Sequence, residues 1–166
     1  FENYSDVLKK LNICLYAAGI SNSQTQDKKL LEREKNRFID FFKKFDQKKK
    51  LVYISTCSIS DPSRNQNLYV LNKLYIEDLV KKNVKKFLIV RLPEVVGKNE
   101  NKFTLINFLN NKIKKEEKFE IWSNAKRNII DIEDVVPLVI NLMENKNLTN
   151  TIINIANPKS YFVNEI

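Results

Sequence analysis

Short apolar runs at regular intervals constrain the fold of this chain more than any other feature. The runs at residues 13–17 (ICLYA), 51–56 (LVYIST) and 87–92 (FLIVRL) have the length and the apolar character of buried strands. Strands that are apolar throughout are typical of a parallel sheet that is covered by helices on both faces. These runs therefore predict an α/β fold with a parallel sheet.

Two longer segments between the runs have helical patterns. At residues 28–45, apolar side chains recur at spacings that fit a 3.6-residue period, and they form one stripe (Leu31, Phe38, Phe41 and Phe45). A second helix is predicted at residues 68–82, with four apolar side chains towards the core (Leu71, Ile76, Leu79 and Val80). Each helix follows one strand and precedes the next, as a parallel sheet requires.

The pattern loosens beyond residue 97. It predicts a helix at residues 103–117, strands at 119–122 and 127–131, a helix at 132–143 and a strand at 151–156. Because no internal repeat or low-complexity linker interrupts the chain, we expect one continuous unit. A small lobe is expected to begin after Gly97.

The composition excludes several kinds of site. The 166 residues include only two glycines, so neither a P-loop nor a glycine-rich dinucleotide turn can be built from them. Histidine is absent, and Cys14 and Cys57 lie in separate apolar runs, which excludes the usual zinc sets and predicts no metal site. Buried reduced thiols predict a cytoplasmic protein, and no apolar run approaches the length of a membrane span.

The net charge of +9 does not by itself indicate a nucleic-acid partner. The basic residues are mostly lysines in pairs on predicted solvent faces and helix ends, whereas a nucleic-acid site would cluster them with exposed aromatic side chains. We therefore expect no nucleic acid as partner. A basic nucleic-acid binder stays open as an alternative that rests on the charge alone.

A candidate proton-transfer site follows the second strand. Tyr69 and Lys73 are four residues apart, which places them on one face of the predicted helix, and Thr56 ends the strand before it. An ammonium close to a phenol stabilises the phenolate, so we expect Lys73 to lower the pKa of Tyr69 and to make it a general acid or base. The alternative is a core tyrosine and a surface lysine that share a helix by accident.

The order LVYIST, YVLNK, FLIVRLPEVVG and RNIIDIEDVV resembles the extended short-chain dehydrogenase/reductase family. Within it, the chain is most similar to the NAD-dependent sugar-nucleotide epimerases, dehydratases and 4-keto reductases. The resemblance covers nearly the whole chain from Ile13. It implies a Rossmann-like sheet, NAD or NADP as cofactor and a nucleotide sugar as substrate.

The resemblance also implies roles for individual residues. Thr56, Tyr69 and Lys73 match the catalytic Ser/Thr, the acid/base and the lysine that tunes it and holds the cofactor ribose. Ala17, Ala18 and Gly19 match the small residues at a strand end against which the cofactor lies. Pro93 matches a position beside the nicotinamide. Arg127 matches an arginine that pairs with the substrate diphosphate. Looser matches are Asn36, to an asparagine that holds a water near the lysine, and Asp134, to a structural aspartate.

On this basis, residues 1–97 form the Rossmann-like portion with the Thr/Tyr/Lys site, and residues 98–166 form the substrate-side portion. The family opens with strand–helix units and a glycine-rich turn that have no counterpart here, and the first residue is not Met. We therefore expect either a fragment that lacks the first two or three strand–helix units or a degenerate relative of the family. The last residues, YFVNEI, resemble the beginning of a helix.

Two readings of the function follow. The first is an NAD(P)-dependent epimerase or 4-keto reductase on a nucleotide sugar. Cys57 stands where the 4,6-dehydratases place an acid, which disfavours dehydration. The second is a non-catalytic relative that serves as a binding or assembly module, which the missing glycine turn and the altered loop after Thr56 both favour. Family members often pair through the two long helices, which implies a homodimer.

Overall fold

A four-stranded parallel sheet forms the centre of the computed structural model, which describes residues 12–98 and 104–166. The strand order is β1 (Ile13–Tyr16), β2 (Lys50–Thr56), β3 (Phe87–Leu92) and β7 (Thr151–Asn154). All three neighbouring pairs are parallel. The predicted α/β fold with a parallel sheet is therefore confirmed.

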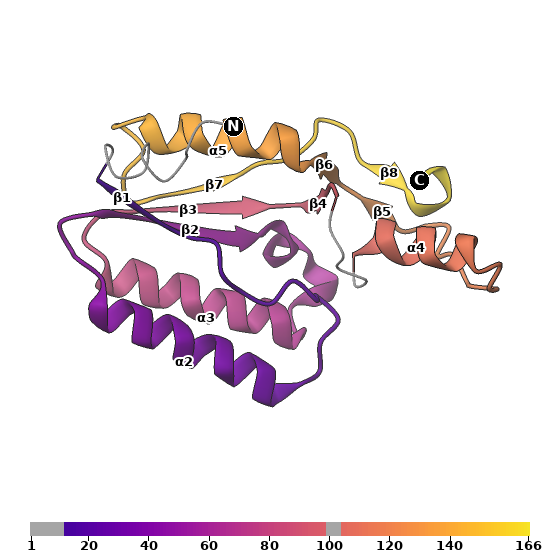
Figure 1. Ribbon diagram of the computed structural model, residues 1–166, viewed down its shortest axis with the longest axis horizontal. Coiled ribbons are helices and arrows are strands. Elements are labelled where there is room, and N and C mark those ends of the chain that lie inside the picture. The colour runs from indigo at the N-terminus through magenta and orange to yellow at the C-terminus, as the bar shows by residue number, and fades with distance from the viewer. Residues whose placement is uncertain (1–11, 99–103) are drawn as a thin grey trace.

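Helices cover both faces of this sheet (Figure 1). Helices α2 (Lys28–Lys44) and α3 (Leu68–Asn83) lie side by side on one face, and α5 (Ile132–Glu144) lies on the other. Each face has its own apolar core, one built with Phe38 and Ile76 and the other with Val135 and Val139. The arrangement is Rossmann-like.

Local sequence explains where the two long helices begin. Asp27 caps α2 by accepting hydrogen bonds from the backbone N–H groups of Lys29 and Leu30 at 2.9 and 3.0 Å. Asn67 caps α3 through the backbone N–H of Val70 at 3.1 Å. These caps satisfy donors that have no partner inside the first helical turn.

The buried face of α3 differs from the prediction. Leu71, expected towards the core, is 43% exposed, whereas Asn72, Lys73 and Glu77 are buried. The apolar pattern of this helix is weak because polar side chains occupy part of its inner face. These side chains belong to the candidate site and to its supporting contacts.

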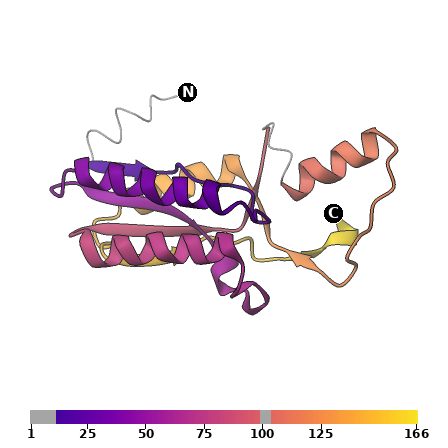
Figure 2. The ribbon, with the colours of Figure 1, turned by 90° about the horizontal axis from the view of Figure 1, so that it is seen from below.

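A smaller region extends from the carboxyl edge of the sheet (Figure 2). It contains two short strand pairs, one helix and three 3-10 turns: β4 (Glu94–Val96) with β6 (Ile129–Asp131), β5 (Lys126–Arg127) with β8 (Tyr161–Phe162), α4 (Leu105–Lys114), η1 (Cys57–Ser60), η2 (Pro62–Arg64) and η3 (Val163–Glu165). Among the described residues, no helix is long and apolar enough to cross a bilayer.

Three predictions for this region were wrong. Residues 119–122 form no strand, and Trp122 is 72% exposed. The strand predicted at 127–131 is two strands in different sheets, because the Asn128 side chain bonds to the backbone of Asn157 and interrupts the run. The YFVNEI segment forms strand β8 and the η3 turn in place of the start of an α-helix.

Candidate functional site

The candidate site lies at the carboxyl edge of the sheet, where the loops after β1, β2 and β3 meet. These loops and the smaller region enclose an open cleft of about 960 Å³. The cleft brings together seven of the eight residues predicted for the site (Ala17, Gly19, Thr56, Tyr69, Lys73, Pro93 and Arg127). Ala18 instead lines a neighbouring cleft of about 310 Å³, which Gly19 also borders.

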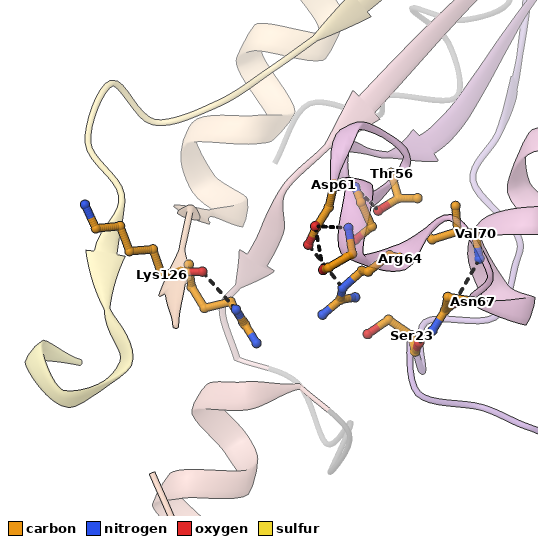
Figure 3. Close-up of polar contacts among 10 residues, drawn as sticks. Ser23, Thr56, Asp61, Arg64, Asn67, Val70 and Lys126 are labelled. Atoms are coloured by element: carbon orange, nitrogen blue, oxygen red, sulfur yellow. Dashed lines mark hydrogen bonds and ion pairs between the residues drawn. The ribbon is translucent and has the colours of Figure 1, made fainter. Parts of the chain in front are cut away.

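Tyr69 lies in the first turn of α3 and is 8% exposed. The Asn67 side chain that caps this helix also donates a hydrogen bond to the carbonyl of Ser23, at 3.1 Å, and so ties α3 to the loop after β1 (Figure 3). Thr56 ends β2 and accepts from the backbone N–H of Ser58 at 3.1 Å. Its side chain also lowers the pKa of the Tyr69 phenol, and both side chains line the same cleft. A hydroxyl and a phenol therefore converge, as the sequence predicts.

Lys73 follows one turn later and is held by a carboxylate that sequence reasoning missed. Its Nζ lies 2.8 Å from Oε1 of Glu34, and both side chains are about 95% buried, with 5% and 4% exposed. The same ammonium lies 5.6 Å from the ring centre of Tyr69 and 5.8 Å from that of Tyr53. Lys73 therefore sits beneath two phenol rings with its charge matched by Glu34.

The expectation that the pKa of Tyr69 lies below its usual value was wrong. Burial raises the pKa of Tyr69, and the Glu34 carboxylate raises it further, while the hydrogen bond with Thr56 and the charge of Arg64 lower it. The net result is a pKa above its usual value. The physical reason is first that the phenol is buried, which disfavours the charged phenolate, and then that the Glu34 carboxylate lies nearby.

The outer part of the cleft carries two arginines. Arg127, on β5, donates from Nη1 to the carbonyl of Lys126 at 2.8 Å. Arg64, on η2, contacts Asp61 at 3.6 Å. The hydroxyl of Ser63, followed by the charges of Arg64 and Arg127, holds the pKa of the exposed Asp61 below its usual value. Both arginines therefore line the large cleft, and both lower the pKa of the same acid.

Two looser matches fall outside this cluster. Asn36 is exposed on α2 and does not border either cleft, whereas Glu34, two residues earlier, reaches Lys73. Asp134 is exposed in the first turn of α5. An acid there needs no further role, because it interacts favourably with the helix dipole.

Cys57, which borders the cleft, donates its thiol to the carbonyl of Arg91 at 3.3 Å, and burial raises its pKa. Within the described ranges, no group of three His, Cys, Asp or Glu side chains is placed to hold a metal ion.

Sequence reasoning missed Glu34 and Arg64. Glu34 does carry one signal in the sequence. It lies three residues after Leu31, on the inner stripe of an amphipathic helix, where an apolar residue is expected. Arg64 offers only its scarcity, since the chain has five arginines among 29 basic residues.

The sequence and the fold both match known proteins. A family model described as "NAD dependent epimerase/dehydratase family" matches residues 12–156. Among curated proteins, no relative matches the sequence.

Many solved structures share the fold. UDP-glucuronic acid 4-epimerase from Bacillus cereus, in complex with UDP-glucuronic acid and NAD, has a TM-score of 0.74 at 18% identity, over 97% of this chain and 59% of the epimerase. TunA, an NAD-dependent NDP-hexosamine 5,6-dehydratase involved in tunicamycin biosynthesis, has a TM-score of 0.75 at 17% identity, over 96% and 59% of the two chains.

A third match is the enzyme WbmG from Bordetella bronchiseptica, in complex with NAD, with a TM-score of 0.68 at 14% identity. The alignment covers 96% of this chain and 56% of WbmG. This chain therefore spans less than two thirds of the length of the structures that it matches.

Proposed function

The chain belongs to the NAD dependent epimerase/dehydratase family, and from that membership we propose that it forms the catalytic part of an NAD(P)-dependent enzyme. Its substrate is a nucleotide-activated sugar, which undergoes epimerisation or 4-keto reduction. The observation that carries the proposal is the convergence of Thr56, Tyr69 and Lys73 in one cleft at the carboxyl edge of a parallel sheet. Several of the structural relatives hold NAD and a nucleotide or nucleotide sugar.

The residues of the cleft fit the nicotinamide end of such a cofactor. The backbone at Gly19 passes so close to Lys73 and Glu34 that a Cβ there would lie 2.6 Å from both Nζ and Oε1. The glycine thus lets the Glu34–Lys73 pair lie against the backbone at the border of both clefts. Lys73 has three N–H donors, so the bond to Glu34 leaves others for ribose hydroxyls. When bound, the cofactor supplies or accepts the hydride.

The chain's own residues then divide the remaining work. Tyr69 exchanges a proton with the reacting sugar oxygen, and the Thr56 hydroxyl shares a hydrogen bond with the same oxygen. Lys73 holds the ribose. Ala17 and Pro93 line the cleft on either side of Thr56 and exclude water. Arg127 pairs with the substrate diphosphate, for which a guanidinium has the matching geometry.

The chain divides by task near Gly97 under this proposal. Residues 1–97 supply the Thr/Tyr/Lys site, and residues 98–166 supply the substrate side, to which Arg127 and Phe108 belong.

We also place a homodimer contact on the outer faces of α2 and α3, where Leu71 and Tyr75 are each 43% exposed. Leu71→Glu should then yield monomers in a sedimentation experiment, and an unchanged mass would contradict this contact.

Tyr69→Phe tests the enzyme proposal. NAD(H), NADP(H) and a panel of nucleotide sugars are titrated against the intact protein and against the variant by calorimetry, and turnover is followed by reduced-cofactor absorbance. We expect binding to be retained and turnover to fall by about 100-fold or more, since the proton-transfer group is gone. Retained turnover would exclude the role of Tyr69. Binding by the unmodified protein without turnover of any sugar would favour the non-catalytic binding module.

A further inference from the structure

Glu34 is coordinated more completely than a chance neighbour of Lys73 would be. Its Oε1 accepts from Nζ of Lys73 at 2.8 Å and from the backbone N–H of Ile20 at 3.3 Å. Its Oε2 accepts from Nδ2 of Asn72 at 2.6 Å. The three donors come from the loop after β1 and from α3, while Glu34 itself lies on α2. One carboxylate therefore joins three segments around the candidate site.

The Glu34–Lys73 pair also lies between the two clefts. Lys73 borders the large cleft, Glu34 borders the small one, and Gly19 borders both. The close approach of Gly19 to Nζ and Oε1 leaves no room for a side chain between backbone and pair. The position of the Lys73 ammonium is thus fixed by Glu34 on α2 as well as by its own helix, α3.

We propose that Glu34 is a positioning residue that acts through Lys73: it fixes the ammonium beside Tyr69 and matches its charge, and thereby makes the phenol a proton donor rather than a proton acceptor. This inference rests on the proposed function, and it adds a preferred direction, the reduction of a carbonyl on the sugar.

The charged and titratable groups around Tyr69 support this direction. They come from four elements: Glu34 on α2, Tyr53 on β2, Arg64 on η2 and Lys73 on α3. Beyond Tyr53 lie Tyr16 and Glu77. Burial raises the pKa of Tyr69, and Glu34 adds to the rise, whereas Thr56 and Arg64 oppose it. The phenol therefore carries its proton into the reaction and gives it up only as negative charge develops on the substrate oxygen.

The proton step balances as follows. Hydride from the reduced nicotinamide cofactor adds to the carbonyl carbon, and the carbonyl oxygen takes the proton of Tyr69. The Tyr69 O–H bond breaks, a new O–H bond forms on the sugar, and a phenolate is left. Thr56 and Arg64, which both lower the pKa of Tyr69, stabilise that phenolate.

Glu34→Gln tests the inference without substrate or cofactor. The intact protein and the variant, each with and without Tyr69→Phe, are titrated by the ultraviolet absorbance of tyrosinate, and the difference isolates Tyr69. Loss of the carboxylate leaves the phenolate as the counter-ion for Lys73, so the pKa of Tyr69 should fall by about one to two pH units. The glutamine amide also has a partner, since Oδ1 of Asn72 accepts no hydrogen bond from any described residue.

Two further variants decide whether Glu34 acts through Lys73. In Glu34→Gln with Lys73→Met, both charges are removed, so the pKa of Tyr69 should return to that of the unmodified protein. A pKa that stays low in this double variant would overturn the inference, as would an unchanged pKa in Glu34→Gln. If an unpaired Lys73 prevents folding of Glu34→Gln, Lys73→Met replaces it: the uncompensated Glu34 carboxylate should then raise the pKa of Tyr69, and an unchanged pKa would overturn the inference. Glu32→Gln is the matched control, because Glu32 is exposed on the same helix and should not move the pKa of Tyr69.

The activity measurement separates this inference from the proposed function. The rate of carbonyl reduction should decline at a lower pH in Glu34→Gln than in the unmodified protein. The difference between the two pH values should equal the shift in the pKa of Tyr69. If no nucleotide sugar is reduced by any form, the proposed function fails, while the titration still reports whether Glu34 controls Tyr69.

Discussion

Arg91 holds Glu77 with two hydrogen bonds, from Nε to Oε1 at 2.9 Å and from Nη2 to Oε2 at 2.6 Å. The Ser55 hydroxyl donates to the same carboxylate at 2.6 Å, and Glu77 is fully buried. The contact joins β3, β2 and α3. Because Glu77 lies one turn after Lys73 on α3, the same contact fixes how that helix presents Tyr69 and Lys73 to the cleft.

Arg91→Met should therefore reduce the free energy of unfolding by about 3–5 kcal/mol, because it leaves a buried carboxylate without its partner. Denaturant unfolding measures this change. Adding Glu77→Leu should recover much of the loss, since both charges are then gone. Lys82→Met, which breaks the exposed Lys82–Asp78 pair, should change little. A similar small effect for Arg91→Met would contradict the structural role of the pair.

Gly19→Ala should disturb the Glu34–Lys73 pair without changing any charge. The added methyl group would lie 2.6 Å from both charged atoms, so one of them must move. Overpacking of this kind costs about 1–3 kcal/mol of stability, which thermal unfolding detects. In the double variant Gly19→Ala with Glu34→Asp, the aspartate side chain is shorter than that of glutamate. This double variant should therefore recover part of the lost stability. An unchanged stability in the single variant would show that the pair is not as close to the backbone as described.

Tyr53→Phe should leave the protein as stable as before, or more stable by up to about 1 kcal/mol. The Tyr53 ring is fully buried, and its hydroxyl finds no hydrogen-bond partner among the described residues. Removing the hydroxyl therefore breaks no hydrogen bond. Tyr16→Phe is the control, because Tyr16 packs against Phe38 and Phe41 in the same core. A clear loss of stability in Tyr53→Phe would mean that the hydroxyl is bonded in the folded protein.

Alkaline pH should destabilise the protein through the same residue. Burial raises the pKa of Tyr53 well above its usual value, so the folded state keeps a proton that the unfolded state releases. The contribution to stability is complete below the unfolded pKa of about 10, and it is lost as the pH rises from there through the folded pKa. The free energy of unfolding, measured across this range, should fall less steeply for Tyr53→Phe. Equal slopes would contradict the prediction.

Arg127→Met should weaken nucleotide-sugar binding by on the order of 10- to 100-fold, the value of a charge-assisted bond to a diphosphate. Calorimetry with a nucleotide sugar and with the free sugar checks it, since only the former should lose affinity. Lys159→Met serves as control, because Lys159 lies over the Tyr161 ring outside the cleft lining. Equal losses in the two variants would point to general charge rather than to Arg127.

The sequence by itself determined the four strands of the main sheet, the long helices and the convergence of Thr56, Tyr69 and Lys73. These follow from local patterns: apolar runs, a 3.6-residue stripe and a four-residue spacing on one helix face. Parallel strands bring their carboxyl ends to one edge, so the cleft's place was predictable as well. The patterns fail where the elements are only two or three residues long, as in β5 and β6, because a single side chain such as Asn128 decides them.

The tertiary structure alone decided the electrostatics of the site. Glu34 reaches Lys73 from another helix, 39 positions away, and Arg91 reaches Glu77 across 14 positions. No local pattern encodes such pairs, since a buried charge is tolerated only where a distant partner meets it. The sequence therefore predicted that Lys73 lowers the pKa of Tyr69. In the fold the pKa of Tyr69 is raised instead, because the phenol is buried and the Glu34 carboxylate lies nearby.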